Sequence, residues 1–412
     1  MTPHLQCRFC KDDLTHTFVD LGKTPLANSY LKDLKAAETE KYYPLHARVC
    51  SNCFLVQVED VVPPEEIFSD YAYFSSYSKS WVEQARQYAE QQIRRFSLNA
   101  DSLVMEVASN DGYLLQHFVQ QNIPVLGIEP AANVAKVAEG KGVRTEVAFF
   151  GVDTAQRLVS KGMKADLIAA NNVMAHVPDI NDFIAGFKIV LADKGVFTIE
   201  FPHLLNLISF VQFDTIYHEH YSYLSLLTVE KILKAHGLKV FDVDELPSHG
   251  GSLRVYACHD DVTDFPVSKT LEKVRQDEEA AQLNKISAYE GFAPRVEKTR
   301  EALLSFLEQA KEDGKKVVAY GAAAKGNTLL NFCGVGTDLI EFVVDRSPEK
   351  QNTYLPGSHL FVHAPTKIAE VKPDYVLILP WNLADEISQE MTHIKNWGGQ
   401  FAIPIPVLKI LS

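Results

Sequence analysis

Two Cys-x-x-Cys pairs near the N-terminus are the feature that most constrains how this chain can fold. They run from Cys7 to Cys10 and from Cys50 to Cys53. Each pair is short enough to direct two sulfur atoms at one position, and four thiolates complete the tetrahedral coordination of Zn(II). A closed coordination shell leaves no position for water, so we expect a structural zinc that stabilises a small N-terminal domain. Two disulfides and a nucleic-acid-binding ribbon are the alternatives.

Length and charge exclude several classes of protein. The chain has 412 residues, enough for two or three domains, and a formal net charge of -13,. A surface that is acidic as a whole repels polyanions, so we expect no nucleic-acid partner. No run approaches the roughly 20 apolar residues that cross a bilayer, which predicts no membrane partner. The N-terminal residues 1–4 lack the features of a secretion signal, and we expect a cytoplasmic location.

From Ser102 onward, short apolar runs alternate with amphipathic segments, which is typical of an α/β protein with a doubly wound sheet. Upstream of this region, apolar residues at spacings of three and four predict a helix from Trp81 to Phe96,. The pair Pro63 and Pro64 predicts a domain boundary between the cysteine-rich segment and that helix. Strands are predicted over 103–108, 125–129, 167–170 and 196–201, with helices that start near residues 112, 131, 154 and 179.

The ends of the first two predicted strands are typical of a nucleoside site. An acidic residue about 20 positions after the first turn is placed to accept hydrogen bonds from two ribose hydroxyls. The turn lacks the sequence G-x-G-x-x-G, so pyrophosphate fits poorly, whereas S-adenosylmethionine has no phosphate to accommodate. We therefore expect S-adenosylmethionine as the cofactor. The candidate contacts here are Glu106, Ala108, Asn110, Gly112, Glu129 and Pro130.

Three further segments supply candidate contacts to the cofactor. At the end of a later strand, two asparagines are placed to bind the methionine end and a histidine to face the substrate. Two phenylalanines flank the adenine or belong to the core. The aromatic and serine-rich stretch 71–78 is either a cofactor lid or a packed loop. The residues concerned are Asn171, Asn172, His176, Phe149, Phe150, Tyr73 and Ser75.

A dense group of titratable side chains occupies positions 217–223, with the sequence Tyr-His-Glu-His-Tyr-Ser-Tyr. Burying such a group merely for packing is costly, because every buried polar atom needs a partner. The segment therefore predicts a site that handles protons. A solvated helix end that happens to be rich in histidine and tyrosine is the alternative.

The C-terminal part has the pattern of a second nucleotide-binding fold. Strands are predicted over 316–320 and 342–345, and the sequence Gly-Ala-Ala-Ala-Lys-Gly-Asn at 321–327 predicts a turn into a helix. This turn matches neither the Walker A nor the dinucleotide fingerprint, which argues against ATP hydrolysis. Amides at a helix N-terminus together with Lys325 suit a sugar-linked diphosphate. Lys350 either closes the other side of that site or is a surface charge.

Six motifs occur in order along nearly the whole chain. They are the two cysteine pairs, the turn 106–112, Gly127–Pro130, Tyr217–His220, His249–Arg254 and Tyr320–Asn327. Together they resemble the sugar C-methyltransferases that build branched deoxysugars on nucleotide carriers, the family of the C-3 methyltransferase of the tetronitrose pathway. The resemblance implies a zinc-binding N-terminal domain (1–68), a central class I methyltransferase Rossmann-like domain (69–285) and a C-terminal Rossmann-like domain that binds a nucleotide-sugar (286–412). We expect a monomer.

The resemblance also implies a reaction. A ring carbon beside a 4-keto group loses its proton to give an enolate, and that carbon then takes the methyl group of S-adenosylmethionine in line. The family's base lies at the last histidine of the 217–220 motif, which is His220 here. Tyr217 and His176 are placed to stabilise the oxyanion, and Glu219 to orient an imidazole or bind the sugar. The expected nucleotide-sugar contacts are Tyr221, Lys325, Asn327 and Lys350.

The expected function is therefore that of an S-adenosylmethionine-dependent C-methyltransferase acting on a nucleotide-linked 4-keto-6-deoxy sugar, at C-3. An NAD-dependent nucleotide-sugar dehydrogenase or epimerase is one alternative, favoured by the C-terminal pattern and disfavoured by the missing glycines. A zinc-ribbon adaptor without enzymatic activity is the other. The sequence does not select the carrier (dTDP, GDP or CDP), the substituent at C-3 or the stereochemical outcome.

Overall fold

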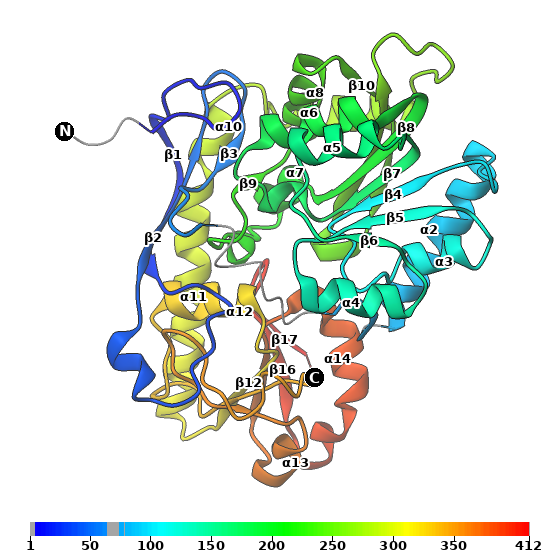
Figure 1. The fold of residues 1–412 in the computed structure, drawn as a ribbon. Helices are drawn as coiled ribbons and strands as arrows, with labels where there is room; N and C mark the ends of the chain where they lie inside the picture. The colour runs from blue at the N-terminus through cyan, green and yellow to red at the C-terminus, as the bar shows by residue number, and fades with distance from the viewer. Residues whose placement is uncertain (1–4, 64–73, 78, 412) are drawn as a thin grey trace.

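The computed structural model describes residues 5–63, 74–77 and 79–411 and contains three β-sheets (Figure 1). Tyr73 lies outside the described residues. Within the described residues, no helix combines the length and the apolar character that crossing a membrane requires.

The N-terminal sheet is antiparallel and has the strand order β1-β2-β3-β9. In β2, the buried side chains of Leu45, Ala47 and Val49 alternate with half-buried ones,. The fourth strand, β9, comes from far along the chain and pairs with β3 beside the cysteine-bearing hairpin (Figure 1). The bounds are β1 His16–Thr24, β2 Tyr43–Val49, β3 Val56–Gln57 and β9 Ser222–Tyr223.

The central sheet has seven strands in the order β10-β11-β8-β7-β4-β5-β6. Its first five strands in sequence are parallel, and β11 runs antiparallel to both β8 and β10. The four predicted strands correspond to β4, β5, β7 and β8, whereas β6, β10 and β11 were not predicted. The bounds are β4 Val104–Val107, β5 Val125–Ile128, β6 Thr145–Glu146, β7 Ala165–Asn171, β8 Leu191–Pro202, β10 Leu238–Leu246 and β11 Ser252–His259.

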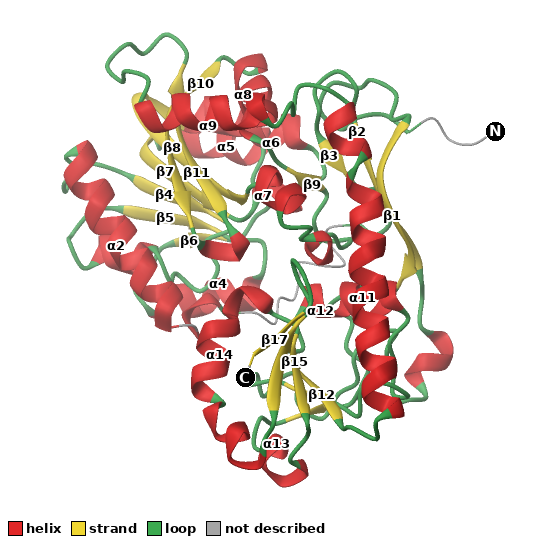
Figure 2. Ribbon diagram, turned by 180° about the vertical axis from the view of Figure 1, so that it is seen from behind, coloured by secondary structure: helices red, strands yellow, loops and turns green. Residues whose placement is uncertain are grey.

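Helices cover both faces of this sheet (Figure 2). Side-chain caps fix where several begin: Asp179 accepts from two backbone amides at the start of α6, and Ser225 and Ser268 do the same for one amide each in α8 and α9,. The bounds are α2 Lys79–Phe96, α3 Leu115–Val119, α4 Ala132–Gly140, α5 Val152–Ser160, α6 Ile180–Val190, α7 Leu204–Ser209, α8 Leu226–Ala235, α9 Lys269–Ala280, α10 Ser287–Glu290 and α11 Phe292–Glu312.

The C-terminal sheet has the order β14-β13-β12-β15-β16-β17, and only β17 is antiparallel to its neighbour. The predicted strands at 316–320 and 342–345 correspond to β12 and β13. Gly321 follows β12 with φ 94°, and an added Cβ would lie 2.4 Å from Cδ of Pro380, so this turn requires glycine,. The bounds are β12 Val317–Tyr320, β13 Val343–Val344, β14 Val362–His363, β15 Tyr375–Ile378, β16 Gln400–Ile403, β17 Lys409–Leu411, α12 Ala324–Cys333, α13 Lys367–Val371 and α14 Ala384–Glu390.

The long helix α11 joins the N-terminal and C-terminal parts of the molecule. It runs alongside β1 (Figure 2), and the rings of Phe18 and Phe292 stack with their centroids 4.4 Å apart. One hydrophobic core extends from the N-terminal sheet across α11 into the C-terminal sheet. Three of the four N-terminal cysteines belong to a second core that is centred on the central sheet. The N-terminal segment is therefore packed against both of the other sheets.

Candidate functional site

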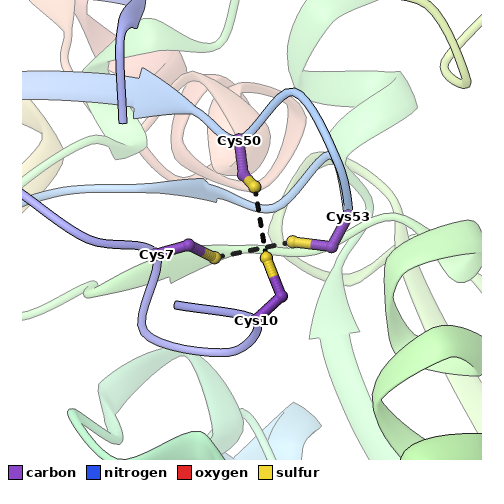
Figure 3. A group of neighbouring side chains, drawn as sticks. All are labelled: Cys7, Cys10, Cys50 and Cys53. Carbon is purple, nitrogen blue, oxygen red and sulfur yellow. Dashed lines mark hydrogen bonds between the residues drawn. The ribbon is translucent and has the colours of Figure 1, made fainter. Parts of the chain in front are cut away.

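The four N-terminal cysteines form a compact sulfur cluster (Figure 3). Their Sγ atoms all lie within 4.8 Å of one another, with 3.5 Å between Cys7 and Cys53 and 3.4 Å between Cys10 and Cys50. These separations exceed the disulfide length of about 2.05 Å and match the edge of about 3.8 Å expected for four sulfurs around Zn(II). Gln57 donates from Nε2 to the sulfur of Cys7 over 3.2 Å, which orients that ligand,. The donor set fits a structural zinc.

The turn after β4 is tied to the end of β5. Ala108 and Asn110 both adopt positive φ angles, 56° and 48°, and the amide of Gly112 closes the turn on the carbonyl oxygen of Ser109,. Glu129 accepts from the backbone amides of Asn110 and Ala131, each over 2.9 Å. A carboxylate has about four acceptor positions, so these bonds fix Glu129 and leave capacity for hydroxyl donors. Pro130 follows directly.

Acidic groups are concentrated behind this turn. Glu106 is 1% exposed, and burial raises the pKa of its carboxyl well above the usual range, while Tyr113 lowers it and Glu129 raises it further. Burial likewise raises the pKa of Glu129, which its two amide partners lower. A cationic ligand would offset the cost of ionising such buried carboxyls. This group of carboxyls is therefore suited to a ligand that carries positive charge.

Several buried polar atoms at the ends of β4 and β7 have no hydrogen-bond partner among the described residues. Asn171 donates to the hydroxyl of Tyr113 over 3.4 Å, but its Oδ1 atom is buried without a hydrogen-bond partner among the described residues. Within the same described part, both side-chain polar atoms of Asn172 and Oδ1 of Asp111 are in this state. Orphaned buried polar atoms need an explanation, and an amino acid ligand supplies the missing partners. This cluster fits the methionine end of S-adenosylmethionine.

The segment before α2 lies on the cofactor turn. The amide of Ser75 donates to Oδ1 of Asn110 over 2.9 Å, and Lys141 bridges Ser76 and Asp111 with distances of 2.6 and 3.1 Å. The structure thus brings Ser75, in the 3-10 helix η2 (Ser75–Tyr77), to the candidate cofactor site.

Other predicted residues lie in different surroundings. The ring of Phe150 packs against Phe183 and Phe187 in the core, and Phe149 is exposed, so the core alternative holds for Phe150. Tyr221 is 1% exposed, and its hydroxyl donates to the carbonyl oxygen of Val62. We therefore leave Phe150 and Tyr221 out of the proposed site.

The residues of the 217–220 motif meet His176, which ends the 3-10 helix η3 (Met174–His176). The hydroxyl of Tyr217 lies 2.7 Å from Nε2 of His220, and Nδ1 of His220 lies 2.9 Å from the carbonyl oxygen of Thr215. A carbonyl oxygen only accepts, so Nδ1 carries the proton and Nε2 is the basic nitrogen that accepts from the phenol. The rings of His176 and His220 are 4.7 Å apart between centroids.

Both imidazoles are kept neutral by their surroundings. Burial lowers the pKa of His220 well below its usual value, and nearby His176 lowers it further. Burial also lowers the pKa of His176 to about 4, although its Nδ1 donates to the carbonyl oxygen of Glu219 over 2.7 Å. A neutral imidazole has a free electron pair available for proton transfer, so the pair can act as a base near neutral pH.

The C-terminal candidates border this cluster. Lys325 donates to Oδ1 of Asn382 over 2.7 Å and lies 4.5 Å from the ring centre of Trp381. Asn327 is buried and donates to the carbonyl oxygen of Ala27 in the N-terminal segment. Lys350 donates to the carbonyl oxygen of Ala322 over 2.8 Å, so its ammonium group faces the turn at 321–327. The structure therefore gathers all three around one turn.

Sequence reasoning missed Asp214, Trp381 and Asn28 in this region, and it assigned no role to His249, although that residue begins one of the six motifs. Asp214 accepts from Nε1 of Trp381 over 2.7 Å, and burial raises its pKa to about 6. His249 lies edge-on to Trp81. Asn28 donates to both carboxylate oxygens of Glu219. Each of these contacts joins residues that are far apart in the chain, so no local sequence pattern predicts it. For His249, the Gly-Gly dipeptide that follows was the one local signal available.

Comparison with known proteins places the chain in a family. C-methyltransferase NovU from Streptomyces niveus is 35% identical over 407 residues, which covers 99% of this chain and 97% of the relative. The chain belongs to the C-methyltransferase family. Family models match as a putative zinc binding domain over 7–68, a methyltransferase domain over 81–243 and a C-methyltransferase C-terminal domain over 247–406. The protein is thus an S-adenosylmethionine-dependent C-methyltransferase with an N-terminal zinc domain, as the resemblance implied.

More distant similarities cover only parts of the chain. A ubiquinone biosynthesis O-methyltransferase from Bartonella quintana (strain Toulouse) is 27% identical over 94 residues, which covers 23% of this chain and 38% of the relative. The solved structure of magnesium protoporphyrin IX methyltransferase from Synechocystis PCC 6803 is 12% identical with a TM-score of 0.35, and covers 48% of this chain and 99% of that one. The family assignment rests on the full-length relative.

Proposed function

We propose that this C-methyltransferase acts on a nucleotide-linked 4-keto-6-deoxy sugar and methylates C-3. The observation that carries the proposal is the tautomer of His220, because its Nδ1 is bonded to a carbonyl oxygen and its Nε2 is basic. Methylating carbon requires removal of a proton from carbon, which needs a positioned base. A ketone beside that carbon makes the proton acidic enough for an imidazole to remove. The resemblance to sugar C-methyltransferases supplies the class of substrate.

In this proposal, Nε2 of His220 takes the proton from C-3, and the C–H electron pair forms the enolate with its charge on the C-4 oxygen. The hydroxyl of Tyr217 stabilises that oxyanion once Nε2 of His220 is protonated and no longer accepts from it, and Glu219 binds a donor group on the sugar,. His176 was expected to share this role, but its one ring proton is on Nδ1 and donates to the carbonyl oxygen of Glu219, so its Nε2 can only accept,. Bound S-adenosylmethionine supplies an electrophilic methyl group on a sulfonium. At the enolate carbon this methyl group would form the new C–C bond, and the electron pair of the S–CH3 bond would stay on sulfur.

The C-terminal sheet offers a place for the nucleotide diphosphate. The amides at the start of α12 and the ammonium groups of Lys325 and Lys350 surround the turn at 321–327, and anions bind at such helix N-termini,. A hollow of about 260 Å³ lies at the ends of β15 and β16, with Trp381 and Asn382 in its lining. Ligands of parallel sheets bind at this edge. Asn327 would support the turn rather than touch the ligand, since it is 1% exposed and its Nδ2 donates to the carbonyl oxygen of Ala27.

We propose domain limits of 1–68, 69–285 and 286–412. The end at residue 285 is supported by β10 and β11, which belong to the central sheet although the C-terminal family model begins at residue 247. We further propose that the protein works as a monomer in the cytoplasm.

A screen of nucleotide-linked 4-keto-6-deoxy sugars tests the function. The enzyme is incubated with S-adenosylmethionine and each sugar on dTDP, GDP and CDP carriers, and mass spectrometry follows the gain of one methyl group. Fragmentation of the product locates the methyl group, and deuterated solvent reports exchange at C-3. We expect a C-3 methyl product with the native enzyme and a rate of its formation lower by at least about 10² with His220→Asn. A methyl group on oxygen or nitrogen would overturn the proposal.

A further inference from the structure

The loop between β1 and the 3-10 helix η1 (Ala36–Thr39) reaches the candidate catalytic cluster from the N-terminal sheet. In this loop, Nδ2 of Asn28 donates to both carboxylate oxygens of Glu219, over 2.8 and 2.9 Å. Glu219 is 5% exposed, whereas Asn28 is exposed. The asparagine therefore covers a carboxylate that the rest of the fold buries.

The same loop is fixed on its other side by the C-terminal turn. The carbonyl oxygen of Ala27 accepts from Asn327 over 2.6 Å, and the hydroxyl of Tyr30 donates to the carbonyl oxygen of Ala322 over 2.5 Å. Two bonds from another domain, flanking one side chain, restrict the positions that Asn28 can adopt. The loop thus spans the space between Glu219 and the turn at 321–327.

Glu219 is linked to the histidines through its own backbone. The backbone carbonyl oxygen of Glu219 accepts a hydrogen bond from Nδ1 of His176, so the position of Glu219 affects the orientation of that imidazole. Burial raises the pKa of the Glu219 carboxyl, and the amide of Asn28 lowers it. Titratable groups near this region include the Tyr30 phenol and the His176 imidazole, and burial keeps both uncharged near neutral pH. Lys350 lies 5.6 Å from the ring centre of Tyr30, and Asp345 also raises the pKa of that phenol.

We propose that Asn28 is a positioning residue that keeps Glu219 ionised and oriented to accept a hydrogen bond from the sugar. This inference rests on the proposed function, in which Glu219 binds a hydroxyl or amino group of the substrate. It adds that the zinc-bearing N-terminal domain takes part in substrate recognition through this loop. Only an ionised carboxylate has both oxygens available as acceptors, so loss of the Asn28 amide weakens sugar binding.

The test compares Asn28→Asp and Asn28→Ala with Ser29→Ala, an exposed neighbour in the same loop. The kinetic constants for the sugar and for S-adenosylmethionine are measured against pH. We expect Asn28→Asp to raise the KM for the sugar about tenfold, to leave the KM for S-adenosylmethionine within about twofold, and to move the acid limb of kcat/KM to higher pH. The acid limb moves because a second carboxylate disfavours ionisation of Glu219.

A second measurement does not depend on the substrate. Infrared difference spectra between acidic and neutral pH report protonated carboxyl groups, and Glu219→Gln identifies the band to which Glu219 contributes. We expect that band to titrate at higher pH in Asn28→Asp, where the two carboxyls titrate as a pair. An unchanged band and kinetics equal to those of Ser29→Ala would overturn the role of Asn28. A native enzyme that methylates no keto sugar, with the band still shifted, would instead overturn the proposed substrate.

Discussion

The hydroxyl of Tyr217 lies 2.7 Å from Nε2 of His220, and the centroids of the two rings are 3.9 Å apart. The phenol therefore donates to the nitrogen that accepts a proton from the substrate in the proposed mechanism. This arrangement keeps Nε2 oriented before the sugar arrives and gives the hydroxyl a short path to the oxyanion.

Removing the base tests this pair directly. We expect His220→Asn to lower kcat by about 10² to 10⁴, because an asparagine amide accepts no proton. We expect Tyr217→Phe to lower it by about tenfold, since the base remains and one donor is lost. Calorimetry should show the same affinity for S-adenosylmethionine in both variants. Near-normal turnover by His220→Asn would remove this residue from the role of base.

The pH profile should reflect the depressed pKa of the histidines. Burial and the neighbouring His176, His249 and Lys325 all lower the pKa of His220. A lowered pKa keeps the imidazole neutral as the pH falls through about 6.5, so the acid limb of kcat/KM should lie below that value. We expect His176→Asn to move the limb upward, because one of the groups that lowers the pKa is gone. An inflection near 6.5 in the native enzyme would contradict the prediction.

A buried carboxylate outside the site should contribute strongly to stability. Glu278 accepts from Nε2 of His203 over 2.7 Å and from the backbone amides of Leu226 and Leu227 over 2.6 and 2.8 Å, which fixes the start of α8. We expect Glu278→Ala to lower the free energy of unfolding by about 3 kcal/mol, because three buried donors lose their acceptor. Urea denaturation measures this loss. The exposed neighbour Glu279 provides the control, and Glu279→Ala should change stability by less than about 0.5 kcal/mol,.

The sulfur cluster predicts one zinc ion per chain. Elemental analysis of the purified protein should find that stoichiometry, and Cys10→Ser should lower it, whereas Cys333→Ala should not. Treatment with a chelator should lower the midpoint of thermal unfolding, because the zinc holds together two hairpins that pack into the central core. Zinc content that survives loss of Cys10 would point to a different set of ligands.

Much of the fold could be predicted from the sequence where the pattern is local. The buried runs of β4, β5, β7 and β8 and the amphipathic helix α2 are each signalled by residues within one segment,. The alternation of β10 is interrupted at Phe241, where the pairing register shifts. The strands β3 and β9 have two residues each. Such short strands exist because of their partners, so no pattern within them could reveal them.

The candidate site likewise contains residues that local motifs predict and residues that they do not. The cysteine pairs and the 217–220 motif each lie within a few positions of the chain, so the sequence indicates both. The contacts between Asn28 and Glu219 and between Asp214 and Trp381 join segments from different sheets. Phe150 was predicted from a local pattern that allows two positions, because an aromatic residue after a strand can pack inward or face a ligand. Its ring contacts with Phe183 and Phe187 in the structure decide for the core.

The pairing of β9 with β3 has a consequence for how the enzyme can be divided. Ser222 and Tyr223, which follow His220 by two and three residues, complete a sheet whose other strands lie before residue 58. We therefore expect that exchanging the amino-terminal segment for that of a relative would disturb the position of His220. Chimeras joined near residue 68 would have to carry matching versions of both stretches. The pairing of β3 with β9 therefore favours keeping the amino-terminal segment and the segment around residues 217–223 together.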